Sequence, residues 1–151
     1  MALRIDILTL FPEMFDSFAA TSIVGRACQR GLLEIHLTNI RDFALDNYGS
    51  VDDAPFGGGP GMVLMCQPIF DAVEHLRADE MLPKGKVVLM TPQGRPLTQA
   101  IAAELAGRDR LIVVAGHYEG FDERIRQGLA DDEISIGDFV LSGGEVAAMA
   151  L

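Results

Sequence analysis

The sequence has few cysteines and no long apolar run, and each shortage excludes a class of protein. Cys28 and Cys66 have neither disulfide-framework nor zinc-ligand spacing, so both are expected to be reduced thiols in or near the core. No apolar stretch approaches the ~20 residues of a membrane span. The first residues, MALRIDILTLFPEMF, lack the pattern of a signal peptide. The sequence therefore predicts a cytoplasmic protein.

Basic residues are also scarce, with 12 Lys and Arg against 22 Asp and Glu, for a net charge of −10. Phosphate contacts need clustered lysine and arginine, so the composition argues against a nucleic-acid surface on this chain by itself. Scattered arginines such as Arg26, Arg30, Arg41 and Arg95 remain candidates for phosphate contacts, although such residues are more often simply solvated. Hydrophobic residues make up 49% of 151 residues, which suits one domain with a sizeable core.

Strand-like and helix-like stretches alternate along the chain. Strands are expected at residues 3–10, 33–40, 86–91, 110–115 and 133–136, and helices at residues 12–20, 23–30, 67–78, 98–106, 124–129 and 146–151. Ser22 is expected to cap the second helix. The continuous apolar runs at residues 86–91 and 110–115 predict a parallel α/β sheet with helices on both faces. Because the last helix is apolar and has no cap, we expect the chain to be truncated.

Three glycine-rich loops follow three of the expected strands, at residues 91–95, 115–120 and 137–145. The carboxyl ends of parallel strands form the crevice where open α/β sheets bind ligands. None of the loops contains GxGxxG opening a helix or GxxxxGK[ST], so a pyrophosphate cradle is unsupported. The loops are better suited to an uncharged adenosine, or to one that carries a cationic group.

Each loop also has a simpler explanation. TPQGR can be an ordinary turn. Ser142 and Glu145 have the spacing of a capping box at a helix start, and Glu119 and Glu123 can be solvated acids. His117 is expected to be a surface histidine rather than a general base, because no paired Ser or Cys is visible. The three loops together nevertheless favour a ligand site.

Five motifs in a fixed order carry a resemblance to a known family. They are LFPEMF, VDDAPFGGGPGM, TPQGR, GHYEGFDER and SIGDFVLSGGE, spread from near residue 3 to the chain end. This set resembles the bacterial tRNA (guanine-N1)-methyltransferases of the SPOUT superfamily. The resemblance implies a SPOUT-type parallel sheet with a C-terminal trefoil knot, and a homodimer. It also implies methyl transfer from S-adenosylmethionine to N1 of the guanosine immediately 3′ of the tRNA anticodon.

The resemblance further implies roles for single residues. Glu119 and Arg124 would be catalytic, with Glu119 also organising a magnesium ion, although no residue is assigned as a metal ligand. Asp52, Asp53 and Gly59 would lie on the substrate side. The cofactor would be bound by Leu89, Met90, Thr91, Pro92, Gln93, Gly94, Gly116, Tyr118, Glu119, Gly120, Ile136, Gly137, Asp138, Phe139, Val140, Leu141, Gly143 and Gly144.

The same resemblance assigns residues 1–151 to the S-adenosylmethionine-binding domain and implies that a C-terminal tRNA-binding domain is absent. The catalytic base, an aspartate, and an assisting arginine would lie in a segment after this chain. The glycine-rich residues 54–62 would form a lid over the bound ligand. His117 stands where many relatives carry Arg, and Ala147 where some carry Pro.

Two other interpretations stay open. The chain could capture S-adenosylmethionine without turnover, as a binding module. It could also be an unrelated α/β nucleotide-binding enzyme such as a dehydrogenase, which the lack of GxGxxG disfavours.

Overall fold

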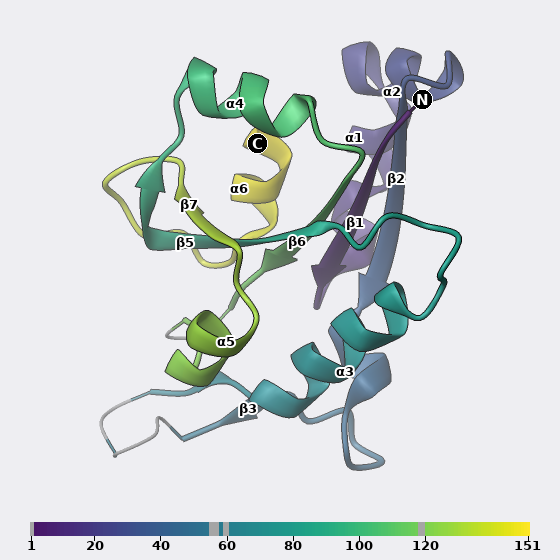
Figure 1. Ribbon diagram of the computed structural model, residues 1–151. Helices are drawn as coiled ribbons and strands as arrows, with labels where there is room; N and C mark the ends of the chain where they lie inside the picture. Colours follow the sequence, from purple (N-terminus) through teal and green to yellow (C-terminus); the bar gives the residue numbers. More distant parts are fainter. Residues whose placement is uncertain (1, 55–57, 59–60, 118–119) are drawn as a thin grey trace.

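The computed structural model describes residues 2–54, 58, 61–117 and 120–151, which fold around one five-stranded parallel sheet (Figure 1). The strand order is β2-β1-β6-β5-β7, and every pairing between neighbours is parallel. The strands are β1 (Leu3–Thr9), β2 (Leu33–Asn39), β5 (Lys86–Pro96), β6 (Arg110–Ala115) and β7 (Asp132–Ser135). This arrangement confirms the predicted parallel α/β sheet.

Helices cover both faces of the sheet. In Figure 1, α4 and α6 lie on one face, and α3 and α5 lie on the other. The helical elements are η1 (Pro12–Phe15), α1 (Asp16–Ala20), α2 (Ser22–Gln29), η2 (Ile40–Phe43), α3 (Cys66–Arg77), α4 (Gln99–Ala106), α5 (Glu123–Gly128) and α6 (Glu145–Ala150). A short antiparallel ribbon, β3 (Asp52–Asp53) with β4 (Val63–Leu64), stands apart from the main sheet. No helix in the described ranges is long and apolar enough to cross a membrane.

The buried strands supply two cores, one on each face. Along β5, Val87 and Leu89 pack into the core shared with α3 and α5. Val88 and Met90 point the opposite way, into the core shared with α4 and α6. Alternating side chains on a strand face opposite sides of a sheet, so a strand covered twice must be apolar at every position. This requirement explains the continuous apolar runs of the sequence.

A side-chain cap is present at one helix start and absent at another. The Thr98 hydroxyl accepts a hydrogen bond from the Ile101 N–H at 3.2 Å and so caps α4. The expected cap at Ser22 is wrong, because Ser22 is itself the first residue of α2 and Thr21 occupies the cap position without a side-chain bond. The Thr21 hydroxyl instead donates to the Ser17 carbonyl at the end of α1.

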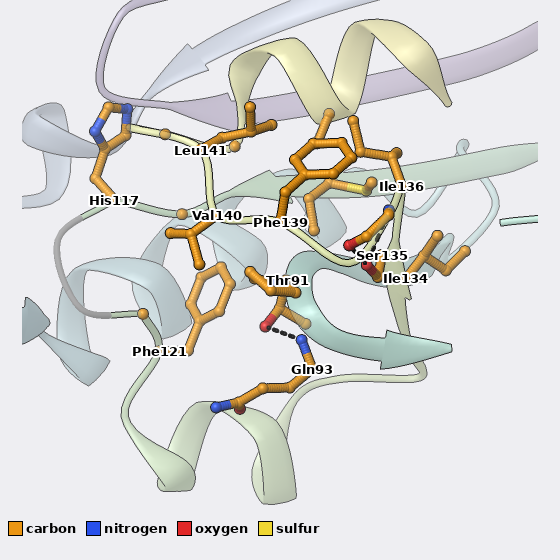
Figure 2. A pocket seen from close by; sticks show the side chains of 18 of the residues that line it. Thr91, Gln93, His117, Phe121, Ile134, Ser135, Ile136, Phe139, Val140 and Leu141 are labelled. Carbon is orange, nitrogen blue, oxygen red and sulfur yellow. Dashed lines mark hydrogen bonds between the residues drawn. The ribbon is translucent and has the colours of Figure 1, made fainter. Parts of the chain in front are cut away.

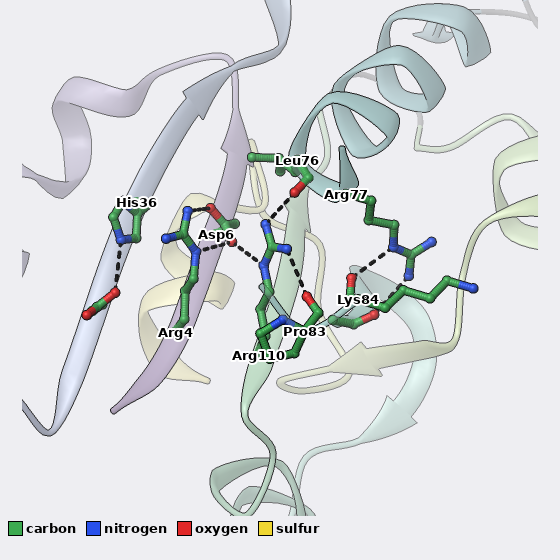
Figure 3. A network of polar contacts seen from close by, with 10 residues as sticks. Arg4, Asp6, His36, Leu76, Arg77, Pro83, Lys84 and Arg110 are labelled. Carbon is green, nitrogen blue, oxygen red and sulfur yellow. Dashed lines mark hydrogen bonds and ion pairs between the residues drawn. The ribbon is translucent and has the colours of Figure 1, made fainter. Parts of the chain in front are cut away.

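A buried ionic network joins β1 and β6 to the end of α3 (Figure 3). Arg110, fully buried, donates to the Asp6 carboxylate at 2.8 Å and to the carbonyls of Leu76 and Pro83 at 2.8 and 2.9 Å. Arg4 donates to both oxygens of Asp6, at 3.0 and 3.1 Å. Buried charges are tolerated only when they are paired and hydrogen-bonded, and here each is.

Arg95, one of the candidate phosphate contacts, has a partner within the protein. Its guanidinium makes a two-pronged bond to Asp132, at 3.0 and 2.6 Å, and this pairing raises the pKa of Arg95. The pair joins the end of β5 to the start of β7.

Candidate ligand pocket

The three loops expected to hold a ligand converge on one pocket, beside the middle of β5 and at the carboxyl ends of β6 and β7 (Figure 2). Its volume is about 310 Å³, at the lower end of the range of small-molecule sites, about 300–1,000 Å³. Of the described residues that line it, only His117 and Arg126 are ionisable. Phe139, Val140 and Phe121 bring apolar surface to the same space.

The first loop is an interruption inside β5 rather than the end of a strand. Met90 and Arg95 both pair with Ile134 of β7, so residues 91–94 are pushed out of the ladder. Within this bulge the Thr91 hydroxyl accepts a bond from the Gln93 N–H at 3.3 Å. Gly94 closes the bulge against β7, where a Cβ atom would lie 2.4 Å from the Glu133 carbonyl carbon. Only glycine permits that approach.

The third loop, after β7, starts with a turn and ends against the second loop. The Ser135 hydroxyl donates to the Gly137 carbonyl at 2.8 Å and accepts from the Gly137 N–H at 3.2 Å. At the other end, the Gly144 N–H donates to the Gly116 carbonyl at 2.7 Å. A Cβ on Gly144 would lie 2.7 Å from the Gly116 nitrogen, so the two backbones touch directly. These contacts fix the loops relative to one another.

His117 and Glu145 are bonded to each other beneath this contact, which corrects two expectations. The His117 side chain is only 16% exposed, hydrogen-bonds to Glu145 through Nε2, and packs against the Phe11 ring at 5.1 Å. It is therefore not a surface histidine. Ser142 and Glu145 do not form a capping box either, because α6 has Gly144 at its cap position and no side-chain cap bond.

The Glu145 carboxyl is buried, with its side chain 2% exposed, and burial raises its pKa. The hydrogen bond with His117 opposes that rise. Its Oε2 atom has no hydrogen-bond partner among the described residues.

Arg126 forms part of the pocket wall from α5. Its guanidinium donates to Glu133 at 2.6 Å and to Glu123 at 3.0 Å, and these carboxylates raise its pKa. The two carboxylates together more than neutralise the single positive charge of Arg126 in the wall.

Most residues expected to bind the cofactor line the pocket, and three described ones do not. Leu89 is buried in the opposite core, Gly94 backs onto β7, and Asp138 lies outside the lining. Tyr118 and Glu119 lie outside the described residues. The lining residues that were expected are Met90, Thr91, Pro92, Gln93, Gly116, Gly120, Ile136, Gly137, Phe139, Val140, Leu141, Gly143 and Gly144. Cofactor binding itself remains a prediction.

Sequence reasoning missed part of the lining. The additional residues are His117, Phe121, Arg126, Ile134, Ser135, Ser142 and Ala147. His117, Phe121, Ser135 and Ser142 lie inside the motifs already quoted, so reading whole motifs would have included them. Arg126 and Ile134 come from helix and strand positions that no local pattern marks, whereas Ala147, like His117, had been noted as a position where relatives carry another residue.

Arg124 lies beside the pocket rather than in its lining. Its guanidinium donates to both oxygens of Asp122, at 3.0 and 2.8 Å, and Asp122 also accepts from the Arg124 N–H as the cap of α5. These bonds lower the pKa of Asp122 to about 2. The Arg124 side chain is 66% exposed, so a substrate can reach it. Its catalytic role is still a prediction.

The residues expected on the substrate side belong to the β3–β4 ribbon. Asp52 and Asp53 pair with Leu64 and Val63, and the Leu64 N–H donates to the Gly120 carbonyl at 3.3 Å. The pKa of Arg124 is raised chiefly by its hydrogen bond to Asp122, with a smaller contribution from the negative charge of Asp53. The ribbon therefore borders the loop that leads into α5, the helix that carries Arg124. Gly59 and most of the proposed lid, residues 55–57 and 59–60, lie outside the described residues.

The fold and the pocket define an α/β protein with a parallel sheet and a ligand pocket framed by glycine-rich loops at the strand ends. Comparison with known proteins identifies the family. The family model for tRNA (Guanine-1)-methyltransferase TrmD matches residues 3–151, and the chain belongs to that family.

Individual relatives agree. The chain is 56% identical to the tRNA (guanine-N(1)-)-methyltransferase of Pelotomaculum thermopropionicum, over 99% of this chain and 59% of that protein. It is 54% identical to the enzyme of the same name from Brevibacillus brevis, over 99% of this chain and 60% of that protein. The crystal structure of tRNA (m1G37) methyltransferase from Aquifex aeolicus matches with a TM-score of 0.90 and 39% identity, over 99% of this chain and 66% of that one. The chain thus spans about 60% of the length of these curated relatives.

Proposed function

We propose that this chain is the S-adenosylmethionine-binding domain of an enzyme that methylates N1 of the guanosine immediately 3′ of the tRNA anticodon. One observation carries the proposal: three loops from three of the family-like motifs form a single pocket. Family membership over residues 3–151 supports the reaction class.

The pocket fits the proposed cofactor. Gly143 and Gly144 line it without side chains and pack directly against His117 and Gly116, so the loops lie close together and the wall carries no bulky group at these two positions. Apolar side chains such as Phe139 and Leu141 suit the flat adenine ring. The near absence of basic side chains in the described lining suits a ligand that carries a cationic sulfur and no phosphate.

In the proposed reaction this chain binds and orients the reactants. S-adenosylmethionine, when bound, supplies a methyl group on a cationic sulfur. Correct alignment of methyl donor and acceptor can accelerate such a transfer by several powers of ten. Guanine N1 carries a proton that a base must remove. The resemblance assigns this base to an aspartate after Leu151, and it assigns supporting roles to Glu119 and Arg124.

The partners and surroundings belong to the same proposal. We expect a homodimer, tRNA as substrate, a cytoplasmic location and a trefoil-knotted path through the loops. The magnesium expected with Glu119 has no further support, since the described residues hold no group of three or more His, Cys, Asp or Glu suited to a metal.

Calorimetric titration with S-adenosylmethionine, with NAD as the control ligand, tests the binding part. We expect saturable binding of S-adenosylmethionine alone. Val140 is 85% exposed in the pocket and Met81 is 91% exposed elsewhere, so Val140→Lys and Met81→Lys are a matched pair. The first variant should weaken binding without changing the melting temperature, and the second should change neither. Binding of NAD, or no binding at all, would contradict the proposed cofactor.

Methyl transfer separates the enzyme from the binding module. The chain is incubated with S-adenosylmethionine and a tRNA transcript that has guanosine 3′ of the anticodon, and digested nucleosides are analysed by mass spectrometry. N1-methylguanosine, absent from a transcript with adenosine at that position, supports the enzyme. Binding without product shows that this chain captures the cofactor without turnover, which is also the result expected of an enzyme domain that needs the base assigned to the segment after Leu151.

A further inference from the structure

The least explained feature of the pocket is the buried pair of Glu145 and His117. Glu145 begins α6 and His117 follows β6, and the two side chains meet 28 residues apart in sequence. One carboxylate oxygen bonds to the imidazole, and the other is buried without a partner among the described residues. The proposed reaction uses neither group.

The pair lies where three segments of the pocket wall meet. His117 lines the pocket and immediately precedes Tyr118 and Glu119, which are two of the residues expected to bind the cofactor. Gly143 and Gly144 lie against it on the second side, where a Cβ on Gly143 would be 2.3 Å from the imidazole. Phe11, from the connection between β1 and η1, covers the ring from the third side.

Stability alone gives little reason for such a pair. Burying a carboxylate is costly, and an apolar pair of similar size is often as stable or more stable. Ala147 anchors α6 in the core, and the Gly144–Gly116 backbone bond already joins the two loops. What the pair adds is a directional bond that fixes the imidazole, and with it the backbone around His117.

We propose that Glu145 and His117 are a positioning pair, which holds the loop after β6 against the Gly143–Gly144 turn and so preorganises the pocket for its ligand. This inference rests on the proposed function, because the ligand considered is S-adenosylmethionine. Neither residue needs to touch the reacting atoms. Preorganised sites depend on such supporting contacts, and a displacement of about 1 Å can cost as much as 100-fold in rate.

The chain offers a matched control for the test. Glu34 and His36 form a second pair of the same residue types at 3.3 Å, but on the exposed surface of β2 and away from the pocket. We compare Glu145→Gln, His117→Gln and their double variant with Glu34→Gln, His36→Gln and their double variant. His117→Arg is added because arginine supplies N–H donors that can bond to the Glu145 carboxylate in place of the imidazole.

Calorimetry with S-adenosylmethionine gives the first readout, under conditions where melting curves show every variant folded. Loss of a charge-assisted hydrogen bond should raise the Kd about ten-fold in each pocket variant. The double variant should bind no more weakly than the single ones, because the two residues act as a unit. His117→Arg should bind within about three-fold of wild type, and the Glu34 and His36 variants within two-fold.

Amide hydrogen exchange without ligand gives a second, independent readout. The N–H of Gly120 bonds to the His117 carbonyl at 3.3 Å, and the N–H of Gly144 bonds to the Gly116 carbonyl at 2.7 Å. Both amides should exchange at least ten-fold faster in Glu145→Gln and at the wild-type rate in Glu34→Gln.

The outcomes separate this inference from the proposed function. If wild type does not bind S-adenosylmethionine, the proposed function fails, and the exchange rates alone decide whether the pair orders the loop. If wild type binds and the pocket variants bind equally well, the positioning role is refuted. The positioning role is also refuted if the Kd of the pocket variants rises only in proportion to the fall in their melting temperature, and if His117→Arg does not bring the Kd back toward the wild-type value.

Discussion

Replacing Gly94 by alanine would place a methyl group 2.4 Å from both the Glu133 carbonyl carbon and the Ile134 nitrogen. Ordinary contact between such atoms is about 3.5–4.0 Å, so the two segments must separate by roughly 1 Å. Both neighbours are backbone atoms in β7, and no side-chain rotation can relieve the overlap. Gly94 also closes the bulge at residues 91–94, so the displacement would reach the pocket.

The expected cost follows from this geometry. Overpacking in well-packed regions costs about 1–3 kcal/mol, and an overlap with backbone on both sides belongs at the upper end. For a chain of this size, about 3 kcal/mol corresponds to a fall in melting temperature of roughly 6–12 °C.

Gly107 provides the control. It ends α4 with φ −80° and ψ −3°, a conformation open to any residue, and the atom nearest to an added Cβ is the Glu104 carbonyl oxygen at 3.5 Å. Gly107→Ala should therefore leave stability unchanged or raise it by up to about 1 kcal/mol. Thermal unfolding followed by circular dichroism compares Gly94→Ala, Gly107→Ala and wild type. If Gly94→Ala melts within 1–2 °C of wild type, the close passage of the bulge against β7 is refuted.

Other predictions concern caps and charges. Asp122→Ala, measured in urea, should lower the unfolding free energy by about 1–2 kcal/mol, because α5 loses its cap. Since the folded pKa of Asp122 is about 2 against 3.8, its contribution is complete above pH 4 and lost toward pH 2, so the gap between wild type and variant should close over that range. Thr98→Ala should cost about 0.5–2 kcal/mol and Thr98→Ser much less. Burial raises the pKa of Glu145, so wild type should gain stability relative to Glu145→Gln as pH falls from 8 to 5; an unchanged difference would contradict that burial.

Local sequence determined the elements and their order. The run RLIVVA at residues 110–115 predicts β6 with its observed ends, because a strand covered on both faces is apolar along its length, here at residues 111–115. The cap at Thr98 was predictable for the same kind of local reason, since its hydroxyl bonds a backbone group three residues away. The position of the glycine-rich loops at the strand ends followed from the alternation of strands and helices.

Tertiary structure decided what the loops do to one another. The sequence predicts the end of β5 at residue 91, but pairing of Arg95 and Pro96 with β7 extends the strand to Pro96 and turns residues 91–94 into a bulge. The side chain of Leu89 points into the core shared with α3 and α5, because successive side chains of a strand face opposite sides of the sheet. Which helices cover each side was decided by the tertiary structure.

The bond between His117 and Glu145 likewise joins two segments that no local pattern connects, and it gives both residues surroundings unlike those expected of a surface histidine and a helix cap. Propensity and periodicity act over a few neighbouring residues, and they determined the strands, the helices and the glycine-rich loops that follow them, whereas the individual pocket residues were expected from the family resemblance. The pairing of distant segments depends on the path of the whole chain, and it alone determined the shape of the pocket and its buried charges.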